Sequence, residues 1–193
     1  MNLLIKIIDF FYQKKKYSFL KKTISKNIDT FIDVGAHEGH TINEFLTIFS
    51  IKKIYAFEPS KKNFDKLKMR VEKIIKDNSI EINIYPFGLG KKNDVLVLNE
   101  ITDGVSNTFN SLKKNSKYFK KKKIIMTLFG IKKFINNKVQ TKIIPLKEFM
   151  IQKKIKKVDF MKIDTEGFEY NTLLGLEDYI KKIKFILFEH HYD

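Results

Sequence analysis

The chain has 193 residues, of which 43% are hydrophobic and 31% are charged, and it contains no cysteine. This composition is typical of one compact domain and excludes a disulfide framework, a thiolate metal site and a cysteine nucleophile. The apolar runs are far shorter than the roughly 20 residues that a membrane-spanning helix requires. We therefore predict no transmembrane helix and expect a cytoplasmic protein.

The net charge of +16 comes from 38 basic and 22 acidic residues. Such an excess ordinarily indicates a nucleic acid or an anionic membrane surface as the partner. However, Arg70 is the only arginine, and the abundance of Lys, Ile, Asn and Phe is the pattern expected from an A/T-rich coding sequence. Because nucleic-acid grooves favour the bidentate guanidinium group of arginine, a nucleic-acid partner is not expected.

Residues 1–28 form a basic, amphipathic leader. Its apolar residues recur at helical spacing before a run of lysines, and they are Leu3, Leu4, Ile7, Ile8, Phe11 and Tyr12. Charged residues interrupt the apolar run and no small-residue cleavage site follows it, which disfavours a signal peptide. We expect a helix packed on the domain, with peripheral contact to an anionic membrane as the alternative.

From residue 29 onward, short apolar segments alternate with longer amphipathic ones. This alternation is typical of βαβ units around a mostly parallel sheet. The predicted strands lie at 30–34, 53–57 and 80–85, and the predicted helices lie at 41–49 and 60–76. The segments 94–98 and 106–109 then break the alternation and predict a β-hairpin or a loop excursion.

A lysine-rich stretch over about 113–138 is the least regular part of the chain, and we interpret it as a solvated insertion. Regular structure is predicted to resume after it, with strands at 139–144, 158–163 and 184–188 and helices at 146–151 and 170–181. Residues 29–193 are therefore predicted to form a single α/β domain that carries this insertion.

The first predicted strand leads from Asp33 into a turn that contains Gly35 and Gly39. Open α/β sheets bind ligands at such strand ends, and glycine lets the backbone approach the ligand. Glu58 follows the second strand beside this turn, where an acidic side chain accepts hydrogen bonds from ribose hydroxyls. The turn has Gly-x-x-x-Gly instead of the Gly-x-Gly-x-x-Gly of dinucleotide sites, which disfavours NAD. An adenosine ligand that carries an ammonium or a sulfonium fits Asp33 better.

Five short blocks follow one another along residues 29–193. They are Asp33-Val34-Gly35-Ala36-His37-Glu38-Gly39, Phe57-Glu58-Pro59, Pro86-Phe87-Gly88-Leu89-Gly90, Met161 to Glu169, and Leu187-Phe188-Glu189. Their order resembles the FkbM-type family of class I S-adenosylmethionine-dependent methyltransferases. The resemblance implies a Rossmann-like α/β sandwich with a mostly parallel central sheet. Class I domains usually add a C-terminal helix and an antiparallel strand pair, which we expect to be missing after Asp193.

The resemblance also implies S-adenosylmethionine as the cofactor and O-methylation of a hydroxyl on a sugar, a glycan or another small metabolite. Asp33 and the glycine turn would frame the methionine moiety, Glu58 would hold the ribose, and Gly88 with Leu89 would lie near the adenine. The implied cofactor-binding residues are Asp33, Gly35, Ala36, His37, Gly39, Glu58, Gly88 and Leu89.

The methyl acceptor is expected at the ends of the last two predicted strands, which open on the same rim of the sheet. Carboxylates and imidazoles are the groups that most often transfer protons in enzymes. The candidates for taking the proton of the acceptor hydroxyl are Asp164, Glu166, Glu189 and His190. No ligand spacing demands a metal, so none is expected. Two alternatives stay open: an RNA methyltransferase, and a non-catalytic basic protein that binds anionic surfaces.

Overall fold

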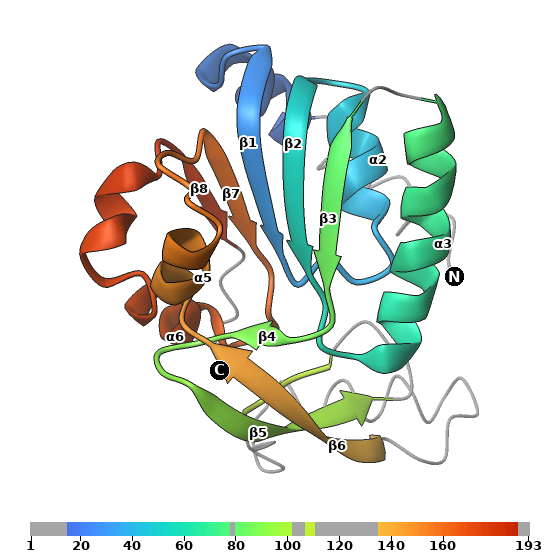
Figure 1. Cartoon of the computed structure of the whole chain (residues 1–193). Helices are drawn as coiled ribbons and strands as arrows, with labels where there is room; N and C mark the ends of the chain where they lie inside the picture. The colour runs from blue at the N-terminus through green and yellow to red at the C-terminus, as the bar shows by residue number, and fades with distance from the viewer. Residues whose placement is uncertain (1–14, 78–79, 102–106, 111–134, 189–193) are drawn as a thin grey trace.

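A computed structural model of the protein describes residues 15–77, 80–101, 107–110 and 135–188. Its centre is a five-stranded sheet in the order β3-β2-β1-β7-β8, in which all neighbouring strands run parallel (Figure 1). The strands are β1 (Asn27–Val34), β2 (Ser50–Phe57), β3 (Glu81–Tyr85), β7 (Phe160–Ile163) and β8 (Ile186–Phe188). The prediction of an α/β fold with a mostly parallel central sheet is thereby confirmed.

The strands β1 and β2 change character along their length. Each starts with exposed and buried residues in alternation and ends with four consecutive buried ones. A continuous apolar run is typical of parallel strands that are covered on both faces. The sequence prediction found these buried halves and missed the alternating halves, which extend the two strands back to Asn27 and Ser50.

One face of the sheet is covered by the helical residues 15–23, by α2 (His40–Leu46) and by α3 (Lys61–Asp77). Leu20 and Phe45 belong to one buried cluster with Phe31 and Phe160, whose ring centroids lie 5.5 Å apart. The described part of the predicted leader is thus packed into the core, and residues 1–14 lie outside the described residues. Within the described ranges, no helix is long and apolar enough to cross a membrane.

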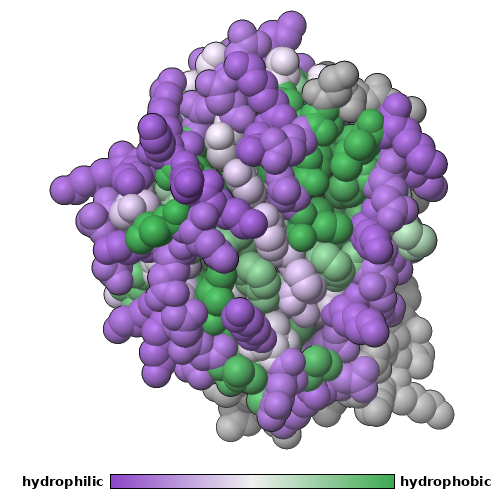
Figure 2. All heavy atoms as spheres, in the orientation of Figure 1, coloured by the Kyte–Doolittle hydropathy of each residue, from purple (hydrophilic) through white to green (hydrophobic). Residues whose placement is uncertain are grey.

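The opposite face carries α5 (Leu146–Gln152), α6 (Glu169–Leu174) and the 3-10 helix η1 (Glu177–Lys182). In Figure 1, α5 lies in front of the β7 and β8 side of the sheet, and no described helix lies in front of β2 and β3. Figure 2 shows hydrophobic side chains gathered over that uncovered region, on a face that is otherwise largely hydrophilic. The two faces of the sheet are therefore covered unequally.

The single helix predicted over 170–181 is divided in the structure. α6 ends at Leu174, and the chain continues through Gly175 and Leu176 into η1. A Cβ atom on Gly175 would lie 2.0 Å from the backbone oxygen of Gly90. This close backbone contact requires glycine, and it marks the point where the helical pattern breaks.

A second, three-stranded sheet lies below the first in Figure 1, in the order β4-β6-β5. Its strands are β4 (Gly88–Leu89), β5 (Asp94–Ile101) and β6 (Ile135–Ile144). The predicted hairpin partner of β5 makes only an isolated bridge, from Thr108 to Asn99, whereas β6 pairs with β5 along its length. Local sequence does not reveal a partner so distant along the chain. β6 also begins inside the stretch predicted as an insertion, and residues 111–134 lie outside the described residues.

Candidate functional site

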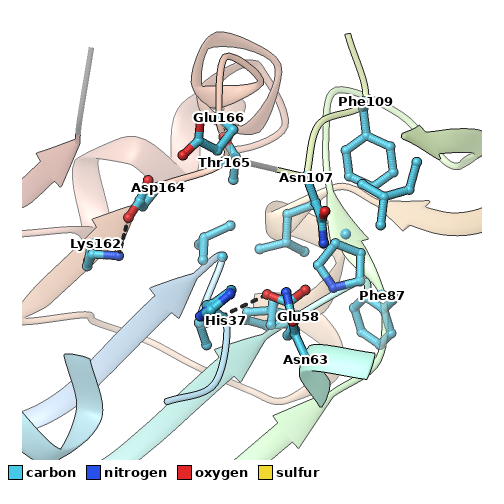
Figure 3. Close-up of a pocket in the computed structure, with 18 of the residues that line it drawn as sticks. His37, Glu58, Asn63, Phe87, Asn107, Phe109, Lys162, Asp164, Thr165 and Glu166 are labelled. Carbon is cyan, nitrogen blue, oxygen red and sulfur yellow. Dashed lines mark hydrogen bonds and ion pairs between the residues drawn. The ribbon is translucent and has the colours of Figure 1, made fainter. Parts of the chain in front are cut away.

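A cavity opens at the carboxyl ends of β1, β2 and β7 and is closed on its other side by residues of the second sheet and of 107–110 (Figure 3). Of the residues predicted from the sequence, those that line it are Gly35, Ala36, His37, Glu58, Gly88, Leu89, Asp164 and Glu166. Asp33 and Gly39 are not on its lining. Glu189 and His190 lie outside the described residues.

The glycine turn is tied to the neighbouring strand by its backbone. The amides of Gly35 and Ala36 both donate to the carbonyl oxygen of Phe57, at 3.0 and 2.9 Å. Gly35 has a φ of 79°, and a Cβ atom there would lie 1.8 Å from the backbone oxygen of Asp164. Both the left-handed backbone and the close approach to β7 therefore require glycine at this position.

Glu58 holds the next part of the turn with its carboxylate. The amides of His37 and Ser60 donate to its two oxygens, at 2.8 and 2.9 Å, and the side chain lines the cavity. His37 adopts a φ of 51° at this point. Burial raises the pKa of Glu58 to about 7, although these hydrogen bonds and one from Asn63 oppose the rise.

The far end of the turn is fixed from α3. Nε of Arg70 donates to the backbone oxygen of Glu38 at 2.6 Å, and Lys66 forms an ion pair with the Glu38 carboxylate. The hydrogen bond from Lys66 lowers the pKa of Glu38. Gly39, with a φ of 80°, packs against Leu67 and leads into α2. Gly39 therefore allows the left-handed backbone of the turn, but it does not line the cavity.

Asp33 lies behind the cavity wall. Its side chain is fully buried, and neither carboxylate oxygen has a hydrogen-bond partner in the described part of the chain. Its nearest cation is Nζ of Lys162, at 3.8 Å. Burial raises the pKa of Asp33 to about 6, even though Lys162 acts in the opposite direction. The Asp33 carboxylate, predicted to frame the methionine moiety, is therefore buried behind the residues that line the cavity and is not itself on the cavity surface.

The lysine at position 162 is a site residue that the sequence prediction missed. Lys162 is only 7% exposed, lines the cavity, and places Nζ 3.0 Å from Oδ2 of Asp164. Its signal in the sequence is a lysine inside the apolar run from Phe160 to Ile163, because a charged residue within a buried strand needs a partner.

The loop at residues 164–169 forms the wall opposite the second sheet. Thr165 and Glu166 line the cavity, and Glu166 has a φ of 53°. One buried oxygen of Glu169, Oε1, accepts from the amides of Thr165 and Gly167 and from the Thr165 hydroxyl, at 2.9, 3.0 and 2.9 Å. A single carboxylate therefore organises the loop that presents Glu166.

Residues 107–110 hold this loop from the other side. The Thr108 hydroxyl donates to the backbone oxygen of Glu166 at 2.8 Å, and the side-chain amide of Asn110 donates to the backbone oxygen of Gly167 at 2.6 Å. Asn107 and Phe109, which alternate with them, line the cavity (Figure 3). None of these four residues has a functional signal in the sequence; 107–109 belong to the predicted hairpin segment, and Asn110 follows it.

The described residues contain no group of three or more side chains placed to hold a metal ion. The structure does bring two of the predicted acceptor-side carboxylates, Asp164 and Glu166, to one cavity with the glycine turn and Glu58. An anionic cavity of this kind suits a cationic ligand more than a phosphate.

A parallel sheet whose first strand leads into a glycine turn, with an acidic residue after the second strand, is the arrangement of a Rossmann-like methyltransferase. The family model of the methyltransferase FkbM domain matches residues 33–193, and the chain belongs to this family.

A crystal structure of methyltransferase FkbM from Methylobacillus flagellatus KT is similar to this chain, with a TM-score of 0.52 and 14% sequence identity. The match covers 81% of this chain and 31% of the other, so the present chain spans less than a third of the length of that protein. At this identity the likeness shows the fold alone. No curated protein matches the chain.

Proposed function

We propose that the protein is an S-adenosylmethionine-dependent O-methyltransferase that acts on a hydroxyl of a sugar, a glycan or another small metabolite. The observation that carries the proposal is an acidic cavity in a chain whose net charge is +16. Glu58, Asp164 and Glu166 line the cavity, whereas Lys162 is the only lysine or arginine on its described lining. The local field therefore favours a cation, as a sulfonium cofactor is.

The residues around the turn fit this cofactor. The missing side chain of Gly35 lets the β1 turn lie against the end of β7, and the turn contributes Gly35, Ala36 and His37 to the cavity. Glu58 would hold the ribose hydroxyls, because it directly follows β2, its carboxylate lies beside the turn, and its side chain lines the cavity. Gly88 and Leu89 would contact the adenine from the side of β4.

When bound, S-adenosylmethionine supplies a methyl group that its sulfonium charge has already activated. The chain would then align the acceptor oxygen with that methyl group and take the hydroxyl proton as the O–C bond forms and the methyl–sulfur bond breaks, with its electron pair left on the thioether sulfur. Glu166 and Asp164 are the described carboxylates on the acceptor side of the cavity, and either can accept a proton from a hydroxyl. Peripheral membrane contact through the leader would bring the enzyme to a surface-bound acceptor.

The two alternative functions are supported by the net charge and not by the cavity. An RNA acceptor would bring phosphates towards Asp164 and Glu166, and like charges repel. A basic protein that only binds anionic surfaces would not need the glycine turn or the buried Glu58. Binding that weakens steeply with rising salt would favour these alternatives, because screening and counterion release act on such surfaces.

The test is calorimetric titration of the chain with S-adenosylmethionine. At pH 8, above the pKa of about 7 at which Glu58 titrates, we expect saturable binding that weakens about tenfold or more in Glu58→Gln, because hydrogen bonds to a charged group contribute about 1.5 to 3 kcal/mol. Glu72→Gln, an exposed change on α3, is the matched control and should bind as the parent does. Transfer is then followed as S-adenosylhomocysteine released with monosaccharides, polysaccharides and RNA.

No binding by a folded parent chain would overturn the proposal. If the parent and Glu58→Gln bind S-adenosylmethionine equally well, the cofactor site stands, but Glu58 does not bind the ribose. Methylation of RNA in preference to sugar hydroxyls would replace the proposed acceptor class.

A further inference from the structure

Lys162 and Asp164 form an ion pair that is presented to the cavity. Nζ of Lys162 lies 3.0 Å from Oδ2 of Asp164, and both residues belong to the lining. In Figure 3 the two side chains lie side by side on one side of the cavity, across it from Asn107 and Phe109. The cavity therefore has a positive and a negative group at one place on its wall.

The sheet register explains this placement. Asp33 of β1 is the direct neighbour of Lys162 on β7, and Asp164 follows Lys162 two positions later. Paired residues of neighbouring strands face the same side, so Asp33 and Lys162 share a face near the carboxyl end of the sheet, and Asp164, directly after β7, reaches the same ammonium. The alternate residues, Met161 and Ile163, face the apolar cluster on the other side.

The charges of this group do not balance among the residues that the structure describes. Asp33 is fully buried, and Lys162 is the one described cation within 4 Å of its carboxylate; the same ammonium also forms an ion pair with Asp164. Two carboxylates share one ammonium, which leaves one negative charge when both are ionised. A buried ion pair that served stability alone gains little over apolar residues of the same size. The unbalanced group at the cavity wall points to a ligand that supplies the missing cation.

The glycine turn lies directly against this pair. A Cβ atom on Gly35 would stand 1.8 Å from the backbone oxygen of Asp164, so the turn and the end of β7 are in contact. A ligand group that reaches the turn from the cavity therefore also reaches Lys162 and Asp164. An α-amino acid presents an ammonium and a carboxylate on one carbon, which is the charge pattern complementary to this pair.

We propose that Lys162 and Asp164 bind the amino acid end of the cofactor, with Lys162 on its carboxylate and Asp164 on its ammonium. This inference rests on the proposed function and deepens it. Asp33 acts through Lys162, as a positioning residue that holds the ammonium in place from below. Glu166 is then the described carboxylate that faces the acceptor hydroxyl.

The test compares three ligands by calorimetry: S-adenosylmethionine, its decarboxylated form, and methylthioadenosine, which lacks the whole amino acid end. Lys162→Met should weaken the binding of S-adenosylmethionine about tenfold or more, and the other two ligands should bind at least as tightly as they bind the parent chain. Asp164→Asn should weaken the binding of S-adenosylmethionine and of its decarboxylated form, and the affinity for methylthioadenosine should not change.

Lys147→Met is the matched control. Lys147 is also paired with two carboxylates, those of Glu177 at 2.9 Å and Asp178 at 2.8 Å, but it is not on the cavity lining. Its loss should leave all three affinities unchanged. If Lys162→Met unfolds because Asp33 loses its cation, the double variant Lys162→Met/Asp33→Asn removes both charges and should show the same ligand pattern.

Equal weakening of all three ligands by Lys162→Met and by the double variant would overturn the inference, because the effect would then be structural. Unchanged affinity for S-adenosylmethionine would overturn it as well, while leaving the proposed cofactor in place. A parent chain that binds methylthioadenosine and S-adenosylmethionine equally would also contradict it. A folded parent that binds none of the three would reject the proposed function, and the inference with it.

Discussion

The two walls of the cavity are held in place by different means. The turn wall, at residues 35–39, lies against β2 and the end of β7 through close backbone contacts, made by the amides that donate to Phe57 and by Gly35, and the side chains of Glu58 and Arg70 add hydrogen bonds to it. The loop wall, at residues 164–169, is held by side-chain hydrogen bonds from the Glu169 carboxylate and the Thr108 hydroxyl. The backbone contact at Gly35 leaves no room for a side chain, whereas the hydrogen bonds of the loop wall can be removed one at a time.

The largest expected effect belongs to the turn wall. Gly35→Ala places a Cβ atom 1.8 Å from a backbone oxygen at a φ of 79°, so we expect a loss of about 3 kcal/mol or more in the free energy of unfolding. Binding of S-adenosylmethionine should be lost with it. Urea unfolding and calorimetry measure the two effects.

Gly39→Ala is the control for this change. It shares the left-handed φ, but its Cβ atom would meet the end of the Leu67 side chain, which can turn away. We expect a smaller loss of stability than for Gly35→Ala. Equal losses would mean that the backbone conformation, and not the contact with β7, makes glycine necessary at Gly35.

The next effect concerns the charge behind the turn wall. The pKa of Asp33 is raised from 3.8 to about 6 by burial, so between these values the folded chain keeps a proton that the unfolded chain has lost. The free energy of unfolding of the parent must therefore fall as pH rises from about 4 to about 6 on account of Asp33. Asp33→Asn removes this slope. We expect its stability relative to the parent to increase by about 2 to 3 kcal/mol over that range.

Urea unfolding of both chains at several pH values from 4 to 7.5 checks this expectation. Glu58 also titrates above its ordinary range, but it is present in both chains, and only the small part of its pKa rise that comes from the Asp33 charge differs between them. A constant difference between the two chains across the pH range would show that Asp33 is not the desolvated acid that the structure describes.

The smallest effect tests the loop wall. Thr108→Val keeps the shape of the side chain and removes two hydrogen bonds of the hydroxyl, the one that it donates to the backbone oxygen of Glu166 and the one that it accepts from the backbone amide of Asn110. We expect a loss of about 1 kcal/mol in the free energy of unfolding, and an affinity for S-adenosylmethionine within about twofold of the parent. If the affinity instead fell as far as in Gly35→Ala, the two walls would contribute to cofactor binding in the same way and would not be held independently.

Much of the fold was predictable because its signals are local. Apolar strands and amphipathic helices alternate in the sequence, and each predicted element of the five-stranded sheet is present, with shifted ends. The second sheet was not predictable, since β5 pairs with β6 across a long stretch of chain and its nearer partner makes only one bridge. The helix predicted over 170–181 is divided at Gly175, whose backbone lies against Gly90, a contact that helical periodicity does not reveal.

The site divides in the same way. The glycine turn and Glu58 follow consecutive strands, so their meeting could be expected from strand order alone. Lys162 was missed because its role appears only when β1 and β7 are placed side by side. Asn107 and Phe109 reach the cavity through hydrogen bonds that Thr108 and Asn110 make with residues more than 50 positions away.

The joint at Asn99 has a consequence for how this domain can be varied. Asn99 is buried, exchanges two backbone hydrogen bonds with Thr108, and donates its side-chain amide to the backbone oxygen of Asn110 at 3.1 Å. On the return side, β6 is anchored to β5 along its whole length. The position of residues 107–110 on the cavity wall therefore depends on β5, and β5 in turn on β6. A substitution at Asn99 should reach the cavity through Asn107 and Phe109, although Asn99 itself is not on the lining.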